Sequence, residues 1–205
     1  MTPSISNSSI DTAMKLILAS NSPRRRELLA GMDLEFSVDT GNNFEETLPE
    51  GVPAEEVPLL LSRGKSLGFH RPLEEGEVLL SADTVVIVDS CVLGKPHSAS
   101  EAATMLRRLS GREHQVVSAV TLRDSGRTLS FSDSATVCFN TLSEGEIDYY
   151  IEHYRPFDKA GAYGIQEWIG YIGISGISGS FFTVMGLPVH KVWSALKSFG
   201  ELPLK

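Results

Sequence analysis

The sequence predicts a mixed α/β fold with a partly antiparallel sheet. Short apolar runs typical of buried strands alternate along the 205 residues with segments whose apolar side chains recur at helical spacing. Some predicted strands are separated only by a short turn, which indicates hairpins and therefore antiparallel pairs. A chain of this length with 41% hydrophobic residues can bury the core of one ordinary domain or of two small lobes.

The first half of the chain predicts four strands and two helices. Apolar or alternating residues place the strands at residues 16–19, 34–38, 77–88 and 91–93. One helix begins at Pro23 with Ser22 as its N-cap, because serine caps well and proline fits the first helical turn. A second helix is expected at residues 57–69. Asp89 and Ser90 turn the long strand into the short strand that follows it, which makes a hairpin.

The second half of the chain predicts four further strands and three helices. The strands are expected at residues 114–122, 128–139, 171–174 and 180–184. The helices are expected from Ser98 or Ser100 to residue 110, from Ser143 to about residue 153, and from residue 187 to about residue 199. Ser143 and Glu146 have the spacing of a capping box. The Gly/Ser-rich segment 173–180 predicts a turn or a close-packed loop.

Composition argues against two classes of partner. The net charge of −8 disfavours duplex nucleic acid, because such binding needs basic residues that neutralise phosphates. The sequence holds no 18-residue apolar run, so no transmembrane helix is indicated.

Residues 1–13 lack the pattern of a secretory signal, and we expect a poorly ordered leader there. Cys91 and Cys138 show no CxxC spacing and are interpreted as two buried thiols in a reducing cytoplasm, with a disulfide as the alternative.

Three arginines at the start of the first helix predict an anion site. A helix N-terminus already carries partial positive charge, so Arg24, Arg25 and Arg26 destabilise it unless an anion binds there. A strand, a small polar turn that contains Ser20, and a basic helix start together suit phosphate groups. The alternative is a solvated arginine cluster. Because the sequence has no P-loop motif, phosphates would be bound without one.

Charged residues elsewhere could complete such a site. Asp83 interrupts an otherwise apolar strand, where a carboxylate is costly unless it is paired, binds a metal or caps a bend. Lys95 projects from a turn, and Lys65 lies on the polar side of a predicted helix. Glu45 and Glu46 belong to an acidic loop. Each alone could be merely solvated, but together they suit a nucleotide polyphosphate with a divalent metal held by carboxylates.

The segment 158–166 combines small residues with polar ones. Its glycines and alanines allow the backbone to approach another group closely. Asp158 and Lys159 supply charge, and Tyr163 supplies a ring. The Gln166 amide donates and accepts hydrogen bonds at once, as reading the edge of a base requires. The alternative is a glycine-rich turn packed against the core. The five histidines lack metal-ligand spacing.

With these residues identified, the chain resembles the Maf family of nucleoside triphosphate pyrophosphatases over about residues 15–196. The matching motifs are residues 20–25 (Ser-Asn-Ser-Pro-Arg-Arg), 81–84 (Ser-Ala-Asp-Thr), 94–96 (Gly-Lys-Pro), 105–116 (Met-Leu-x-x-Leu-Ser-Gly-x-x-His-x-Val), 159–166 (Lys-Ala-Gly-Ala-Tyr-Gly-Ile-Gln) and 184–188 (Val-Met-Gly-Leu-Pro). The resemblance implies that residues 14–205 form one domain. Its fold would be elongated and two-lobed with a central cleft, similar to that of inosine triphosphate pyrophosphatases.

The resemblance also implies a reaction and a site. The reaction is hydrolysis of a nucleoside triphosphate to the monophosphate and pyrophosphate with a divalent cation, Mg²⁺ or Mn²⁺. Arg24, Thr84 and Gln166 match the branch that acts on dTTP and UTP and would set specificity. Asp83 would be the proton acceptor and a metal ligand. The residues that would complete the phosphate and metal site are Ser20, Arg25, Lys65, Lys95 and Glu46, with Glu45 as the alternative to Glu46.

The sequence departs from the family pattern at two positions. Glu167 stands where the family usually has glycine and adds negative charge beside the expected base pocket, and Ser118 replaces a common threonine.

Two alternative functions stay open. One alternative is a pyrophosphatase for 7-methyl-GTP or another modified nucleotide. The other is a nucleotide-binding regulator of cell division without catalysis. The resemblance further implies a cytoplasmic homodimer whose partner is a nucleoside triphosphate, and neither a nucleic acid nor a membrane.

Overall fold

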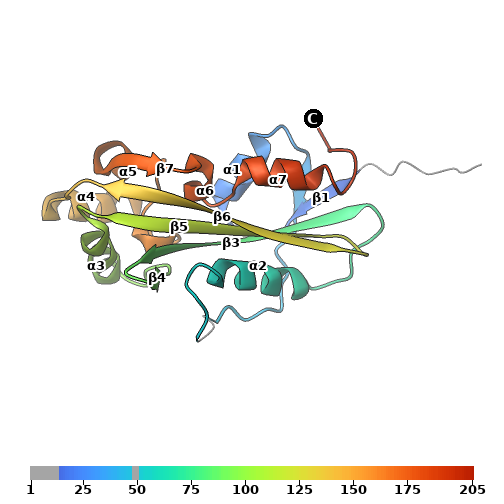
Figure 1. Cartoon of the computed structure of the whole chain (residues 1–205), viewed down its shortest axis with the longest axis horizontal. Coiled ribbons are helices and arrows are strands. Elements are labelled where there is room, and N and C mark those ends of the chain that lie inside the picture. The colour runs from blue at the N-terminus through green and yellow to red at the C-terminus, as the bar shows by residue number, and fades with distance from the viewer. Residues whose placement is uncertain (1–13, 48–50) are drawn as a thin grey trace, which may run out of the picture.

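Three long antiparallel strands run along the length of the molecule (Figure 1): β3 (Glu77–Val88), β5 (Glu113–Arg123) and β6 (Thr128–Phe139). The computed structural model describes residues 14–47 and 51–205. Valine and other β-branched residues favour the extended backbone of these strands. The central strand, β5, is buried along most of its length because elements cover it on both faces.

The sheet holds seven strands in the order β2-β1-β3-β5-β6-β7, and β4 pairs with β3 off this path. The shorter strands are β1 (Lys15–Leu18), β2 (Phe36–Val38), β4 (Cys91–Leu93) and β7 (Ile174–Ser178). β1 pairs in parallel with β2 and β3, whereas the other pairs are antiparallel. The predicted mixed, partly antiparallel α/β fold is therefore confirmed.

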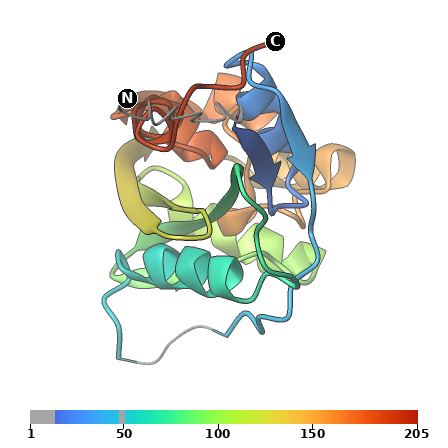
Figure 2. The same ribbon diagram turned by 90° about the vertical axis from the view of Figure 1, so that its right-hand side faces the viewer.

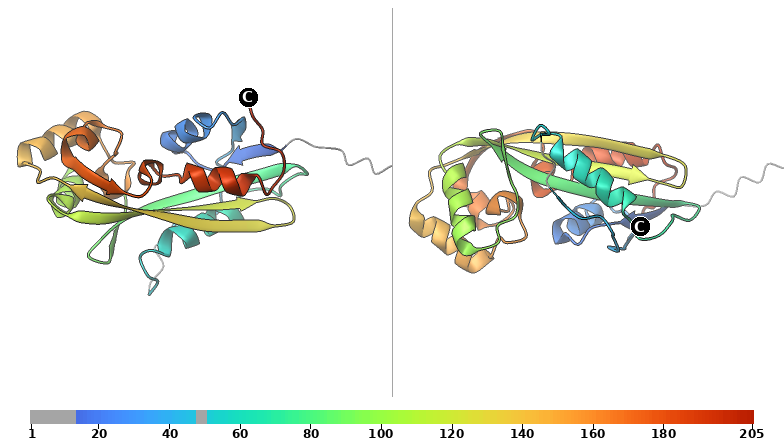
Figure 3. Two further views of the ribbon diagram at one scale, coloured as in Figure 1. Left: turned by 45° about the horizontal axis from the view of Figure 1, so that its top comes forward. Right: turned by 90° about the horizontal axis from the view of Figure 1, so that it is seen from below.

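Helices cover both faces of this sheet. They are α1 (Pro23–Ala30), α2 (Val57–Leu67), α3 (Ala99–Leu109), α4 (Glu144–Tyr154), α5 (Trp168–Gly173), α6 (Phe181–Met185) and α7 (Val189–Leu196), with a 3₁₀ turn, η1, at Ala160–Ala162. Helix α2 lies on one face, and α1 and α7 lie over the other (Figures 1 and 2). Helices α3 and α4 gather at one end of the sheet (Figure 3). The helices at the two ends form the two predicted lobes.

Two apolar clusters hold the helices on the sheet. Leu29 of α1, Leu106 of α3 and Leu196 of α7 are fully buried and belong to one cluster that extends through both lobes. On the opposite face, Leu61 of α2 packs in a smaller cluster that includes Val85 of β3. Burial of such side chains contributes about 2 kcal/mol each. Packing on the two faces therefore fixes the helices of both lobes to one sheet.

One stretch of β3 has a strand neighbour on only one side. Along the other edge of β3, β1 pairs with it as far as Leu80, and β4 begins to pair with it at Val86. Within the described residues, no strand covers the intervening residues 81–85 on this side, although β5 pairs with them on the other. Successive side chains of a strand point to opposite faces. Asp83 and Thr84 therefore emerge on opposite faces of the sheet at the same open edge.

The segment from residue 168 to residue 185 corrects three predictions. Residues 171–174 were expected to form a strand, but most of them belong to α5; residues 180–184 were expected to form another, but α6 occupies them. The expected loop at residues 173–180 contains β7, whose Ile177 pairs with Val137 of β6. Isoleucine, phenylalanine and threonine favour strands locally. Contacts with distant segments override such a preference in short elements.

Several local features bear directly on the remaining predictions. Ser98, and not Ser100, is the N-cap of α3, and its hydroxyl accepts a hydrogen bond from the Glu101 N–H. Both cysteines are free, but Cys91 is exposed and Cys138 is half-buried, so the prediction of two buried thiols is wrong. The expected leader at residues 1–13 lies outside the described residues. No helix among those described is long and apolar enough to span a membrane.

The capping box of α4 generates a stability prediction. The Ser143 hydroxyl accepts a hydrogen bond from the Glu146 N–H at 3.3 Å, and the Glu146 carboxylate accepts one from the Ser143 N–H at 2.7 Å. Ser143→Ala should lower the free energy of unfolding by about 1 kcal/mol, because the Glu146 N–H loses the hydroxyl that accepts its hydrogen bond. Urea denaturation measures the change, with Ser143→Thr as the control that keeps the hydroxyl. Equal midpoints for all three proteins would contradict the prediction.

Candidate active site

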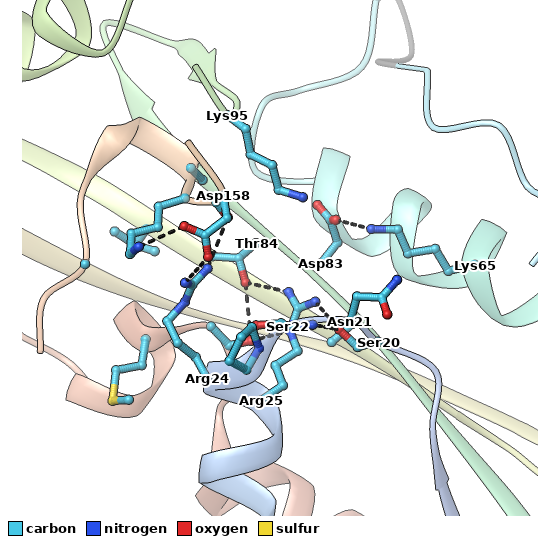
Figure 4. A pocket seen from close by; sticks show the side chains of 18 of the residues that line it. Ser20, Asn21, Ser22, Arg24, Arg25, Lys65, Asp83, Thr84, Lys95 and Asp158 are labelled. Atoms are coloured by element: carbon cyan, nitrogen blue, oxygen red, sulfur yellow. Dashed lines mark hydrogen bonds and ion pairs between the residues drawn. The ribbon is translucent and has the colours of Figure 1, made fainter. Parts of the chain in front are cut away.

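A cleft of about 330 Å³ opens along the uncovered edge of β3 (Figure 4). Its walls come from the turn between β1 and α1, the segment before α2, the start of the β4–α3 connection, the loop around η1 and the end of α6. The structure brings all the predicted site residues to this one cleft, namely Ser20, Arg24, Arg25, Glu46, Lys65, Asp83, Thr84, Lys95 and Gln166. Glu45 does not line it. The alternative of an isolated, solvated arginine cluster is therefore wrong.

The turn between β1 and α1 brings two arginines to opposite parts of the cleft. Pro23 starts the helix and Ser22 is its N-cap, as predicted, although the Ser22 side chain makes no capping hydrogen bond. The Ser20 hydroxyl instead accepts hydrogen bonds from the Ser22 N–H and from Arg25, both at 3.2 Å. Arg26 does not line the cleft and is exposed. Only two of the three arginines of this helix therefore line the cleft.

Arg25 is held entirely by neutral oxygens. Its Nε donates to the Gly186 carbonyl at 3.0 Å, and its two terminal nitrogens donate to the hydroxyls of Ser20 and Thr84 at 3.2 Å each. Burial lowers the pKa of the guanidinium, and the charge of Asp83 partly offsets that effect. An arginine in a protein nevertheless stays protonated. The cleft therefore contains a half-buried, oriented positive charge with no carboxylate bonded to it within the described residues.

Arg24 contributes to a different arrangement, an ionic chain that leads to Glu167. Arg24 Nη1 lies 2.7 Å from the Asp158 carboxylate, which also accepts a hydrogen bond from Lys159 Nζ at 2.8 Å. Lys159 Nζ lies 3.1 Å from Glu167 Oε1, and the Tyr150 hydroxyl donates to the same carboxylate. Partial burial opposes ionisation of Asp158, but hydrogen bonds from Lys159 and Arg24 outweigh it and lower its pKa to about 2. Glu167 is thus neutralised by a lysine and does not line the cleft.

Asp83 and Glu46 converge on one lysine. Lys65, in the last turn of α2, places its Nζ 2.6 Å from Asp83 Oδ1 and 3.1 Å from Glu46 Oε1. Asp83 pairs in the middle of β3 with Ala119, so it does not cap a bend. Lys95 enters the cleft from above, with its amine directed toward Asp83 (Figure 4). Two carboxylates and two amines therefore face the same part of the cleft.

These two carboxylates fit a divalent cation only together with other ligands. Among residues 14–47 and 51–205, no group of three or more acidic, histidine or cysteine side chains could hold a metal. Mg²⁺ is commonly bound by one or two carboxylates together with substrate phosphates and waters. Asp83 and Glu46 have hard oxygens and meet at Lys65, so they suit a cation that arrives with a polyphosphate.

The glycine-rich loop at the far wall presents an amide without a partner. Gly161 has φ +66°, and a Cβ there would lie 2.9 Å from the Val86 side chain, so glycine lets the loop pack against β3. Gly161 N–H also donates to the Gly94 carbonyl at 3.0 Å. Gln166 Oε1 is buried and accepts no hydrogen bond from any described residue. A buried oxygen without a donor is costly, and this oxygen keeps the capacity to accept a hydrogen bond.

The site includes residues that sequence reasoning left out of its proposed set. Asp158 and Lys159 belong to the segment 158–166 that was singled out, so their charges were visible, but the pairing of Asp158 with Arg24 was not. Gly186 belongs to a matched motif, but it contributes a backbone oxygen, which residue type does not reveal. Its φ of +119° explains why glycine occupies this turn.

Comparisons with known proteins agree with this site. Residues 15–199 match the family model described as Maf-like protein. A "dTTP/UTP pyrophosphatase" of Porphyromonas gingivalis is 52% identical over 189 residues, which cover 91% of this chain and 95% of that protein. A protein of the same description from Phocaeicola vulgatus is 50% identical over 183 residues, covering 89% and 95%.

Among solved structures, a HAM1 protein from Coxiella burnetii is similar over 90% of this chain and 99% of its own, with 15% identity and a TM-score of 0.46. That likeness is too weak to carry an argument. The family match and the relatives at about half identity extend over nearly the whole chain and include every residue of the cleft. The chain therefore belongs to the Maf family.

Proposed function

We propose that this chain is a nucleoside triphosphate pyrophosphatase that hydrolyses dTTP and UTP to the monophosphate and pyrophosphate. The observation that carries the proposal is the cleft itself, where a half-buried arginine without a carboxylate partner lines the same space as Asp83 and Gln166. The names of the similar proteins support the same activity and the same two substrates.

The triphosphate is proposed to bind at the basic side of the cleft. Arg25 supplies the uncompensated positive charge, Ser20 a hydroxyl, and Lys95 a second cation that reaches in from the rim. Lys65 is shared between two carboxylates, so its charge is already balanced before a ligand binds. Charge that develops on the oxygen between the α- and β-phosphates during cleavage would be stabilised by Arg25, Lys65 and Lys95.

Asp83 is proposed to activate water. A water oxygen attacks the α-phosphorus, the bond from that phosphorus to the bridging oxygen breaks, and pyrophosphate leaves. The Asp83 carboxylate accepts the proton that the water loses. Its side chain is only 13% exposed and is held by Lys65 at 2.6 Å, so its orientation is fixed before substrate arrives. This rigidity supports the role, because general bases act only when correctly positioned.

The proposed cofactor is a divalent cation, Mg²⁺ or Mn²⁺, held by Asp83 and Glu46 together with the substrate phosphates. The cation would neutralise phosphate charge and so favour attack by water. Glu46 is preferred over Glu45 because it contacts Lys65 and lines the cleft, whereas Glu45 does neither. Lys65 would hold the two carboxylates near each other when the cation is absent.

Gln166 is proposed to recognise the base. Uracil and thymine share an N3–H donor beside an O4 acceptor. The buried Oε1 of Gln166 lacks a donor, so it suits N3–H, and the adjacent amide N–H suits O4. Arg24 and Thr84 are proposed to set specificity with it. The neutralised Glu167 adds no free negative charge to this pocket, which supports pyrimidine triphosphates over the alternatives weighed from the sequence.

The proposal also includes a homodimer in the cytoplasm. The exposed side chains of Tyr171, Ile177 and Phe181 form an apolar patch beside β7, an edge strand of the sheet, and such a patch supports self-association. Two free cysteines, one of them exposed, support a reducing compartment. Light scattering coupled to size-exclusion chromatography measures the oligomeric state directly.

Pyrophosphate release from a panel of nucleoside triphosphates with Mg²⁺ tests the reaction. The protein should act on dTTP and UTP, and Asp83→Asn should lower kcat by about 10²-fold or more, because the amide cannot accept the proton. Glu45→Gln is the control, since it removes a carboxylate outside the cleft. Near-normal turnover by Asp83→Asn would remove Asp83 from the mechanism. Activity on 7-methyl-GTP alone, or nucleotide binding without turnover, would instead establish one of the alternatives.

Gln166→Glu tests base recognition. The carboxylate accepts hydrogen bonds but offers no N–H to O4, so kcat/KM for dTTP and UTP should fall by about tenfold or more. The ranking among the nucleotides should change with it. Gln115→Glu, at the only other glutamine of the chain, is the control outside the cleft. An unchanged substrate ranking in Gln166→Glu would show that this residue does not recognise the base.

Arg25→Ala tests phosphate binding. Loss of a charge-assisted contact should raise KM and lower kcat together, with kcat/KM reduced by about 10²-fold. Arg26→Ala removes the neighbouring arginine, which is exposed and outside the cleft, and should behave as the unmodified protein does. If both variants keep normal steady-state kinetics, Arg25 does not bind the substrate.

A further inference from the structure

Three polar side chains lie in one row across the three long strands. Thr84 of β3 is the register partner of Ser118 of β5, and Ser118 is the partner of Asp133 of β6. The row faces α6, whose Thr183 is buried against it. Ser118 and Thr183 have no exposed surface, and neither they nor Asp133 line the cleft. Buried polar groups at the centre of a sheet are costly unless each has a partner.

The hydrogen bonds in this row have a defined direction. A carbonyl only accepts, so the Ser118 hydroxyl donates its single proton to the Thr183 carbonyl at 2.8 Å. The Thr84 hydroxyl has two acceptors within reach, Ser118 Oγ at 2.8 Å and the Gly186 carbonyl at 3.4 Å, and it donates to the much closer Ser118 Oγ. Because the Thr84 proton is used in this way, the Thr84 oxygen is the acceptor for Arg25 Nη2 at 3.2 Å. The chain of donors therefore runs from Arg25 through Thr84 and Ser118 to Thr183.

Ser118 also supports the Gly186 carbonyl, another oxygen that accepts a hydrogen bond from Arg25. The Thr183 carbonyl that it bonds belongs to α6, and the Thr183 hydroxyl donates to Asp133 at 2.6 Å. Lys191 of α7 pairs with Asp133 at 2.6 Å, so that carboxylate is neutralised away from the cleft. Helix α6 ends at Met185, and its C-cap residue, Gly186, has a carbonyl that accepts from Arg25 Nε at 3.0 Å. Two of the three oxygens that hold Arg25 thus depend on Ser118.

We propose that Ser118 is a positioning residue that orients Arg25 toward the bound triphosphate through Thr84 on one side and α6 on the other. The proposal rests on the proposed function insofar as the ligand is a triphosphate. Thr84 then acts by holding Arg25, and its effect on specificity is indirect, because its only proton is already donated within the row. The oxygens that accept hydrogen bonds from Arg25 are neutral, so Arg25 is oriented while its charge stays available to the ligand.

Two measurements on Ser118→Ala test this role. Steady-state kinetics with dTTP should show kcat/KM about tenfold lower, the effect of losing one net hydrogen bond at the site. Isothermal titration with tripolyphosphate should show a dissociation constant higher by about the same factor. Ser118→Thr keeps the hydroxyl and should stay within about twofold of the unmodified protein in both. Ser110→Ala removes a hydroxyl that accepts the Leu142 N–H at 2.7 Å outside the cleft and is the control.

A double-mutant cycle with Arg25→Lys separates positioning from general destabilisation. Lysine keeps the charge but lacks the planar fork, so the separate contacts of Arg25 Nη2 with Thr84 and of Arg25 Nε with Gly186 are lost in their present form. In that background Ser118→Ala should weaken tripolyphosphate binding by less than about twofold, because the contact that it supports is already gone. An equal loss in both backgrounds, or no loss with native Arg25, would overturn the proposal, as would failure of the unmodified protein to bind tripolyphosphate.

The tripolyphosphate titration also distinguishes this inference from the proposed function. If the unmodified protein releases no pyrophosphate from any nucleotide, the proposed function fails. The coupling between Ser118 and Arg25 is still decided by binding of the anion alone. If the protein is active but the cycle shows no coupling, the proposed function stands and the positioning role of Ser118 does not.

Discussion

The site depends on one interruption in the sheet. Strand β3 is paired with β5 from Leu79 to Ile87, but β1 leaves its other edge at Leu80 and β4 joins it only at Val86. The uncovered edge between them lets two consecutive side chains, Asp83 and Thr84, reach one cleft from opposite faces of the sheet. A carboxylate directed toward α2 and a hydroxyl directed toward α6 thereby serve the same ligand. The long, fully paired strand beneath keeps that geometry rigid.

The cations of the cleft differ in whether their hydrogen-bond partners are carboxylates or neutral oxygens. Arg24 is paired with Asp158, and Lys65 is shared by two carboxylates, so neither adds uncompensated charge. Arg25 is held by a carbonyl and two hydroxyls and keeps its full charge. An oriented charge in a partly buried site acts more strongly on an anion than the same charge in water. This distribution fits an enzyme that directs polyphosphate to one arginine while holding an acid ready beside it.

Helix and strand features that depend on residues close in sequence could be predicted from the sequence. The strands at Glu77–Val88 and Thr128–Phe139 have the predicted bounds, because long apolar or alternating runs of β-branched residues leave few options. The capping box at Ser143 was predicted for the same reason. The predictions failed between residues 168 and 185, where the elements are short. Partners distant in sequence, such as β6 for β7, decide their form.

The sequence by itself determined the fold class, the family resemblance and the residue types of the candidate site, because these depend on periodicity and on short motifs. Only the tertiary structure decided what each residue contacts. It gave Arg24 an ionic partner and Arg25 neutral ones, although the two are adjacent and chemically identical. It also neutralised Glu167 with Lys159 and joined Ser118 to Arg25 through Thr84. Such pairings arise when strands and loops far apart in the chain meet, so no local pattern encodes them.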